Sequence, residues 1–250
     1  MKDPALLHDL IETLALLRVY DILEFEEKYD QQYHALKFLK AKFRGRNFIA
    51  LVALNALVCY RLSCRGETYW WEFSRYFTKL RPKDSLSMLK EFLSSSRCNR
   101  LGIRQKLRRI EKVHDVVDRL VNNINWLVRN QLRFAWEVAR RLGCDTGTKT
   151  VAFMVKMVNY ALRISTGEKI VAPFDIDIPL DRRILDVSGR LGIRNSRQEW
   201  RRISLSTGIP PLHIDSLIWV GYELSREGLL LVDNDRIRRI LEIISKVLRG

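Results

Sequence analysis

The chain has 250 residues, of which 47% are hydrophobic and 10% aromatic, so it can bury a core and is not a disordered protein. Lys and Arg number 44 against 29 Asp and Glu, which gives a net charge of +15. This excess favours a polyanionic partner, nucleic acid ahead of an anionic membrane surface, while a basic surface rich in ion pairs is the alternative.

Export and membrane insertion are both disfavoured. The first ten residues, MKDPALLHDL, lack the uninterrupted apolar core of a signal peptide. The longest apolar stretch, residues 48–60, is broken by Asn55 and is too short to span a bilayer. We therefore expect a cytoplasmic protein with no membrane partner.

The cysteines and histidines give no metal-binding pattern. Cys59, Cys64, Cys98 and Cys144 form no CxxC pair, and the four histidines are scattered. We expect four reduced thiols, no bound metal and no organic cofactor.

Apolar residues at helical spacing fill two long proline-free tracts, residues 5–81 and 83–172, and predict an all-α fold. The helices are expected near residues 4–19, 46–63, 67–80, 84–96, 100–122, 125–142, 149–165, 180–191, 196–206, 211–226 and 234–248.

The composition changes at residues 167–180, where prolines favour an extended chain. This segment is interpreted as the crossing between two helical subdomains. We expect a central subdomain over 44–167 and a second one formed by 1–43 together with 168–250.

Two glycines bracket the turn before residue 149. Gly143 and Gly147 lie between the helix that ends at Leu142 and the one that begins at Lys149. Backbone N–H groups exposed at such a turn suit a phosphate oxygen. An ordinary C-cap followed by an N-cap is the simpler interpretation of the turn by itself.

Lys149 lies in the first turn of its helix, where the helix dipole disfavours a cation. A lysine that loses its proton can attack a carbon and form a Schiff base. The alternative is an ordinary surface lysine whose long side chain reaches water. Phe153, Lys156 and Tyr160 follow on the same face at helical spacing. Two lysines on one stripe predict a helix that faces a cleft.

Asp181 follows Pro179 and opens the next helix, which is a favoured place for a capping carboxylate. The functional interpretation is a carboxylate that stabilises positive charge on a sugar and moves protons. Asp175 and Asp177 in the preceding segment are competitors for that role.

These features together resemble the helix-hairpin-helix DNA glycosylases, and most closely the archaeal 8-oxoguanine DNA glycosylases known as AGOG. The resemblance spans residues 28–222. It is carried by KTVAFMVKMVNYA (149–161), PFDIDIPLDRR (173–183), GIPPLHIDSLIW (208–219), DQQY (30–33), LNAL (54–57) and GETYWWEF (66–73). The tail after residue 226 does not obviously match.

The resemblance implies a role for particular residues. Lys149 matches the Schiff-base lysine and Asp181 the essential aspartate. Phe153 and Trp219 match aromatic residues that sandwich a flipped base. Further positions in the base pocket are matched by Gln32, Trp70, Lys156 and Asp215.

Helical spacing gives partial independent support, since Asp215 and Trp219 are four residues apart and share a helix face. A stacking ring and a hydrogen-bond acceptor could then read a purine edge. The structural alternatives are a core tryptophan and a first-turn helix acid. For Trp70 and Trp71, the alternative is that one is in the core and the other on the surface.

Basic residues outside the pocket are candidates for phosphate contacts without sequence preference. Arg104 and Arg108, on the basic face of the helix expected over 100–122, are the leading ones. The wider group comprises Arg97, Arg100, Arg104, Lys106, Arg108 and Arg109.

The resemblance implies two helical subdomains of the helix-hairpin-helix glycosylase type with an active-site cleft between them. It implies a bifunctional glycosylase and AP lyase that excises 8-oxoguanine in base excision repair. We expect a monomer that acts on damaged DNA in the archaeal cytoplasm, associated with the nucleoid. Two alternatives stay open: a glycosylase for another damaged base, and a non-catalytic DNA-binding helical protein.

Overall fold

The computed structural model describes residues 4–43, 47–79, 84–228 and 232–249. Within these ranges there are fourteen α-helices and no β-strand, so the predicted all-α class is confirmed. In chain order the helices are α1 (Pro4–Ala15), α2 (Val19–Tyr29), α3 (Gln31–Lys42), α4 (Phe48–Leu57), α5 (Gly66–Phe77), α6 (Ser85–Ser95), α7 (Ile103–Val121), α8 (Ile124–Arg129), α9 (Gln131–Leu142), α10 (Lys149–Thr166), α11 (Arg182–Arg190), α12 (Ser196–Thr207), α13 (Pro211–Arg226) and α14 (Asp235–Arg249).

Two helices, α2 and α3, occupy most of the stretch between residues 20 and 45, where no helix was predicted. α2 begins after Arg18, whose backbone N–H donates to the Asp21 carboxylate at 3.1 Å, as in a capping box. α1 ends at Ala15 and does not continue to residue 19.

Asn130 divides the single helix predicted over 125–142. Its backbone N–H donates to the Leu127 carbonyl at 3.2 Å, while its own carbonyl accepts from the Phe134 N–H at 2.9 Å. Its side-chain amide donates to the Trp126 carbonyl at 2.8 Å. One residue therefore ends α8 and starts α9. The predicted helix limits at residues 46 and 80 lie outside the described residues.

The chain divides into two compact units. Unit 1 comprises Met1–Asp30 and Val171–Gly250, and unit 2 comprises Gln31–Ile170. The expected limits were residues 44 and 168, and residue 44 lies outside the described ranges. α3 belongs to unit 2 because it packs against α5 and α10.

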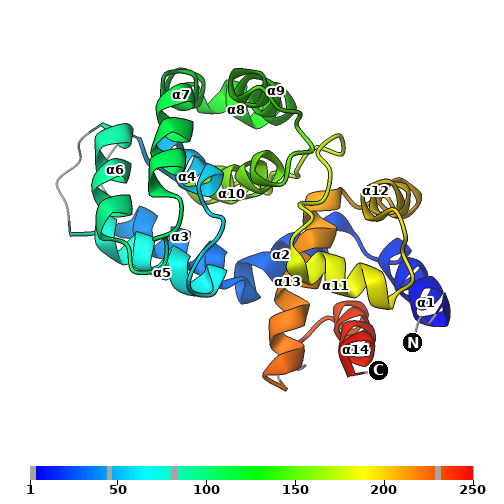
Figure 1. Ribbon diagram of the computed structural model, residues 1–250. Coiled ribbons are helices and arrows are strands. Elements are labelled where there is room, and N and C mark those ends of the chain that lie inside the picture. The colour runs from blue at the N-terminus through cyan, green and yellow to red at the C-terminus, as the bar shows by residue number, and fades with distance from the viewer. Residues whose placement is uncertain (1–3, 44–46, 80–83, 229–231, 250) are drawn as a thin grey trace. The chain divides into compact units, whose positions relative to one another are not determined.

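Unit 2 is built around α4 and α10 (Figure 1). All ten residues of α4 are buried, which fits its sequence FIALVALNAL, apolar on every side. Twelve of the eighteen residues of α10 are buried as well. The helix that begins at Lys149 is therefore held along most of its length.

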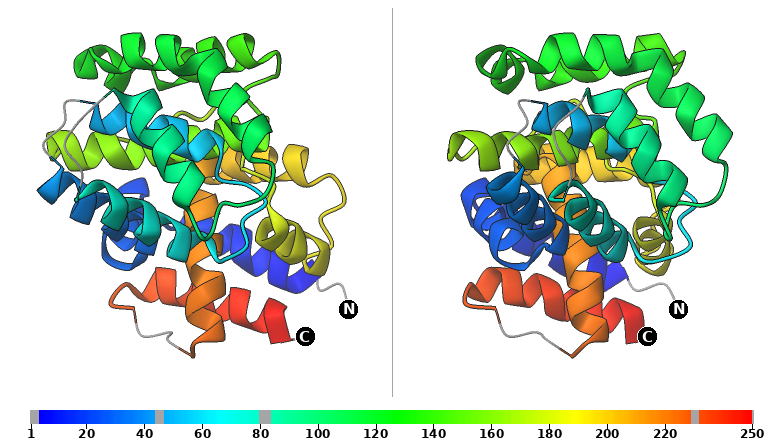
Figure 2. Two further views of the ribbon diagram at one scale, coloured as in Figure 1. Left: turned by 60° about the vertical axis from the view of Figure 1, so that its left-hand side comes forward. Right: turned by 90° about the vertical axis from the view of Figure 1, so that its left-hand side faces the viewer.

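In unit 1, α14 crosses α13 (Figure 2). Gly221 lies at this contact, where an added Cβ would come within 2.8 Å of Leu241 Cδ2 and 2.9 Å of Ile244 Cδ1. Glycine thus permits the close approach of the two helices. The apolar face of α14 joins the core of unit 1, so the tail after residue 226 is an integral part of that unit.

The expectation of four reduced thiols is wrong, because Cys64 and Cys98 form a disulfide. Cys59 and Cys144 are free. The bond joins the loop before α5 to the loop after α6. This proximity arises from tertiary packing, which cysteine spacing does not reveal.

Candidate active site

The turn before α10 presents Lys149 at the surface. Gly143 ends α9 in the left-handed region, at φ 72°, and the N–H of Cys144 donates back to the Ala139 carbonyl at 3.0 Å. The chain then turns through Gly147, which is buried, and α10 begins at Lys149. The turn therefore contains the C-cap that the glycines suggested.

The Lys149 side chain is exposed, and within the described ranges it has no hydrogen bond or ion pair. The first-turn position also keeps its amine away from the carbonyl end of the helix. The Lys149 side chain is thus sterically accessible to a ligand.

Two aromatic rings and a thiol lie close together in unit 2. The Trp70 and Phe153 ring centroids are 6.3 Å apart, with Trp70 fully buried and Phe153 half-buried. Burial raises the pKa of the Cys59 thiol to about 12, against the opposing effects of the Lys149 and Lys106 charges and of the neighbouring Trp70 indole. Cys59 therefore lies beside Trp70 and within electrostatic range of Lys149, and Trp70 and Phe153 are neighbours in this unit.

Farther along α10 the predicted stripe is buried. Lys156 is only 2% exposed, and its ammonium lies 5.8 Å from the centre of the Tyr160 ring. Tyr160 in turn contacts Tyr33 of α3 edge-on at 5.3 Å. Gln32, the residue before Tyr33, is 1% exposed. Beyond Phe153 the predicted stripe is therefore packed against the neighbouring helices α3 and α4.

In unit 1, Asp181 is the N-cap of α11. Its carboxylate accepts from the Ile184 backbone N–H at 2.9 Å, and the residue is half-buried. Its competitors, Asp175 and Asp177, both pair with Arg201 at 3.2 Å. Among the described residues Asp181 has no such cationic partner, which separates it from the two competing aspartates.

α13 carries Asp215, which is 3% exposed, and Trp219, which is half-buried. The guanidinium of Arg183 stacks on the Trp219 ring at 3.6 Å from its centre and donates to the Trp219 carbonyl at 3.3 Å. Arg183 also forms a 2.8 Å ion pair with Glu223. The sequence did not single out Arg183, although it lies two residues after Asp181.

A second feature that sequence reasoning missed holds the start of α13. His213 Nδ1 and Glu26 Oε1 are 2.8 Å apart, and both side chains are buried. The Ala172 backbone N–H donates to His213 Nε2 at 3.0 Å. Since Nε2 accepts, Nδ1 carries the proton and donates to Glu26. This chain of contacts fixes the helix on which Asp215 and Trp219 lie.

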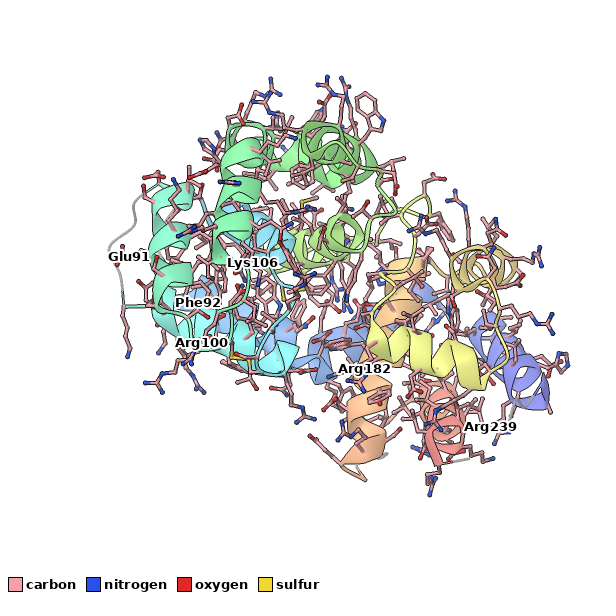
Figure 3. The ribbon with its side chains drawn as sticks, viewed as in Figure 1. Glu91, Phe92, Arg100, Lys106, Arg182 and Arg239 are labelled. Atoms are coloured by element: carbon pink, nitrogen blue, oxygen red, sulfur yellow. A yellow bond between two sulfur atoms is a disulfide. The ribbon has the colours of Figure 1, made fainter. Side chains whose placement is uncertain are left out.

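The basic residues of α7 separate into two kinds. Arg104 and Arg108 are exposed, as phosphate contacts require. Lys106, labelled in Figure 3, is instead fully buried and donates to the Tyr60 carbonyl at 2.6 Å and to the Asn99 side chain. Arg109 donates to Thr150 Oγ1 at 2.6 Å. Lys106 is therefore not a phosphate contact, and Arg109 is committed to the start of α10.

Two negative observations concern only the described part of the chain. No helix there combines the length and the apolar character needed to cross a bilayer. No group of three or more His, Cys, Asp or Glu residues there could hold a metal ion.

Comparison with known proteins identifies the relatives of this chain. The profile of the AGOG N-glycosylase/DNA lyase family matches residues 11–249. An N-glycosylase/DNA lyase of Methanopyrus kandleri is 41% identical over 202 residues, covering 80% of this chain and 84% of the relative. One from Thermococcus kodakarensis is 37% identical over 237 residues, covering 93% and 88% respectively.

The fold agrees with these matches. The crystal structure of Pa-AGOG, the 8-oxoguanine DNA glycosylase of Pyrobaculum aerophilum, in complex with 8-oxoguanosine is similar with a TM-score of 0.82 and 27% identity. The similarity covers 97% of both chains. The predicted resemblance, the enzymatic class and DNA as the partner are thereby confirmed, and the alternative of a non-catalytic DNA-binding protein is not supported. The chain belongs to the AGOG family of N-glycosylase/DNA lyases.

Proposed function

We propose that this chain excises 8-oxoguanine from DNA and then nicks the strand, as a step of base excision repair. The observation that carries the substrate is the similarity over 97% of both chains to an 8-oxoguanine DNA glycosylase bound to 8-oxoguanosine. An exposed amine at the first turn of a buried helix, four residues before Phe153 on the same helix, supports the assignment of Lys149 as nucleophile.

In the proposed reaction, neutral Lys149 Nζ attacks C1′ of the damaged nucleotide as the bond from C1′ to the base breaks, and the base leaves with a proton. The sugar ring opens, and the amine and C1′ form an imine. Removal of a proton from C2′ then expels the 3′ phosphate by β-elimination. Water hydrolyses the imine and releases Lys149.

Asp181 is the proposed acid–base group of this sequence. Its carboxylate would stabilise positive charge on the sugar as the base departs, and transfer protons to and from Lys149. The absence of a cationic partner among the described residues supports this choice over Asp175 and Asp177, which Arg201 neutralises.

Recognition of the base is assigned to aromatic side chains and to buried polar ones. Phe153 and Trp219 would stack on the faces of the flipped purine. A buried carboxylate at Asp215 suits an N–H edge of the base, because a charged acceptor forms a strong hydrogen bond away from water. The remaining proposed contacts are Gln32, Trp70 and Lys156.

Contacts to the DNA backbone are assigned to the turn before α10 and to α7. Gly143 has open space beside it and, together with Gly147, is the proposed phosphate contact near the N-terminus of α10. Arg104 and Arg108 are exposed on α7, where they would add affinity without sequence preference. We further propose that the protein is a monomer, which light scattering of the purified protein would test. It would act in the cytoplasm on nucleoid DNA.

Borohydride trapping on a duplex with one 8-oxoguanine tests the role of Lys149. The wild type and Lys112→Gln, which alters another exposed lysine, should give a covalent adduct, and Lys149→Gln should give none. An undiminished adduct with Lys149→Gln would overturn the assignment. A panel of other lesions tests the substrate separately, since faster release of another base would refute 8-oxoguanine and leave the lyase chemistry in place.

Asp181→Asn tests the second role without removing the helix cap, because Asn is as good an N-cap as Asp. The expected result is an unchanged melting temperature together with excision slowed by about a hundredfold or more. Normal excision by this variant would reduce Asp181 to a structural cap.

A further inference from the structure

A groove in unit 2 lies apart from every residue assigned to the base or to the reaction. It runs between α5, α6 and the loop after α6, and has a volume of about 720 Å³. Its main lining side chains are Trp71, Arg75, Tyr76, Lys79, Phe92 and Arg97. Trp70, next to Trp71 on α5, points into the core, so the groove uses the other face of that helix.

The groove is lined by more cations than carboxylates. Arg75, Lys79 and Arg97 are exposed, and none of them has a carboxylate partner among the described residues. The Glu72 carboxylate also lines the groove. It accepts hydrogen bonds from Ser96 Oγ at 2.9 Å and from the backbone N–H of Arg97 at 2.6 Å. An anion that enters would therefore meet three cations and one carboxylate whose oxygens are already hydrogen-bonded.

Hydrogen bonds and a disulfide fix the backbone of the wall that bears Arg97. Besides the bond to Glu72, the Arg97 carbonyl accepts from Ser63 Oγ at 3.0 Å. The next residue, Cys98, is tied to Cys64 by the disulfide, drawn in yellow in Figure 3, and its carbonyl accepts from the Ser63 N–H at 2.8 Å. A fixed backbone lowers the entropy lost when the arginine side chain binds a ligand.

The other walls are aromatic and are also held in position. The Trp71 indole N–H donates to Gln31 at 3.3 Å, and the guanidinium of Arg75 lies 5.4 Å from the centre of the Trp71 ring. The Tyr76 hydroxyl donates to Glu91 at 3.1 Å. Phe92, labelled in Figure 3, lies beside Tyr76 with ring centroids 5.2 Å apart.

Cationic side chains next to aromatic rings suit a nucleic-acid backbone, in which phosphates alternate with the apolar faces of sugars. We propose that this groove binds the sugar–phosphate backbone of a DNA strand, outside the residues that handle the damaged base. The proposal rests on the membership of a DNA-acting family and not on which base is removed. Phosphates pair with Arg75, Lys79 and Arg97, and deoxyribose rings pack on Trp71 and Tyr76.

The test compares two variants with the same loss of charge. Arg75→Gln/Arg97→Gln removes two groove cations, and Arg119→Gln/Arg129→Gln removes two exposed arginines of α7 and α8 that do not line the groove. Binding to a long undamaged duplex is measured by fluorescence anisotropy between 50 and 200 mM salt. Two lost phosphate contacts lower the slope of log K against log salt by about 1.8, so the affinity advantage of the wild type should shrink about tenfold over that range.

The control variant should retain nearly the wild-type slope. Equal slopes for the two variants would overturn the proposal, because the groove arginines would then act only through net charge. Thermal melting of both variants checks that the fold is unchanged. Since the duplex carries no lesion, this result is independent of excision. Release of 8-oxoguanine by the wild type in a single turnover tests the proposed function separately, and its failure would count against that function alone.

Discussion

The buried Lys106 predicts an unusual pH dependence of stability, which Lys106→Met would reveal. Burial lowers the pKa of Lys106 from an ordinary 10.5 to about 8. Between these pH values the unfolded chain holds a proton that the folded chain has released. The unfolding free energy therefore rises with pH in this window, and the contribution is lost as pH falls through 8.

The size of the effect follows from the width of the window. A pKa difference of this size is worth about 3 kcal/mol, and since the Lys106 side chain is fully buried no large reduction for solvent screening applies. Met fills a similar volume and cannot titrate, but it removes the donor to the Tyr60 carbonyl and the Asn99 side chain. At pH 7 the loss of these hydrogen bonds opposes the relief from burying a charge.

Urea unfolding at pH 7.5, 9 and 10.5, followed by circular dichroism, measures the difference between the wild type and Lys106→Met. The wild type should gain about 3 kcal/mol relative to the variant across the series. Lys112→Met, at an exposed lysine of the same helix, serves as the control and should differ from the wild type by the same amount throughout. A pH-independent difference for Lys106→Met would refute the reasoning, because Lys106 would then titrate alike in both states.

Three further outcomes are expected. Replacing Cys64 and Cys98 by Ser opens a covalent loop with a separation of 34 residues. The free energy of unfolding, measured in urea, should fall by about 4 kcal/mol. A change below about 1 kcal/mol would show that the disulfide adds little to stability. Cys59 should react very slowly with iodoacetamide at pH 8, since a thiol pKa of about 12 leaves about a thousandfold less thiolate than in a free cysteine; labelling at the rate of an exposed thiol, seen by mass spectrometry, would contradict this. Arg183→Lys keeps the charge but loses the planar stack on Trp219, so it should lower stability by about 1 kcal/mol, and thermal melts equal to the wild type would show the stack to be unimportant.

The residues that sequence reasoning placed correctly are those governed by local rules. Gly143 and Gly147 predicted a turn ahead of Lys149, because a left-handed C-cap and a helix start are encoded within a few residues. Asp181 was expected to cap its helix for the same reason, and it does.

One incorrect expectation could have been avoided from helical spacing, whereas the other features depend on contacts between distant segments of the chain. Lys106 shares helical spacing with Ile103 and Ile110, so its place on the apolar face of α7 could have been inferred. The Cys64–Cys98 bond and the stack of Arg183 on Trp219 join different segments of the chain, and single-sequence patterns do not specify such pairings. How Lys149 and Asp181 act together remains a proposal that the variants above test.

The division of the chain has a consequence for its synthesis on the ribosome. Unit 2 is one continuous stretch, Gln31–Ile170, whereas unit 1 needs the first 30 residues together with everything from Val171 onward. The contact of Glu26 with buried His213 can form only after 187 more residues have been synthesised. Since a domain folds when all its parts have emerged, the half that bears Lys149 can form during translation, while α1 and α2 expose apolar side chains until the C-terminal helices arrive.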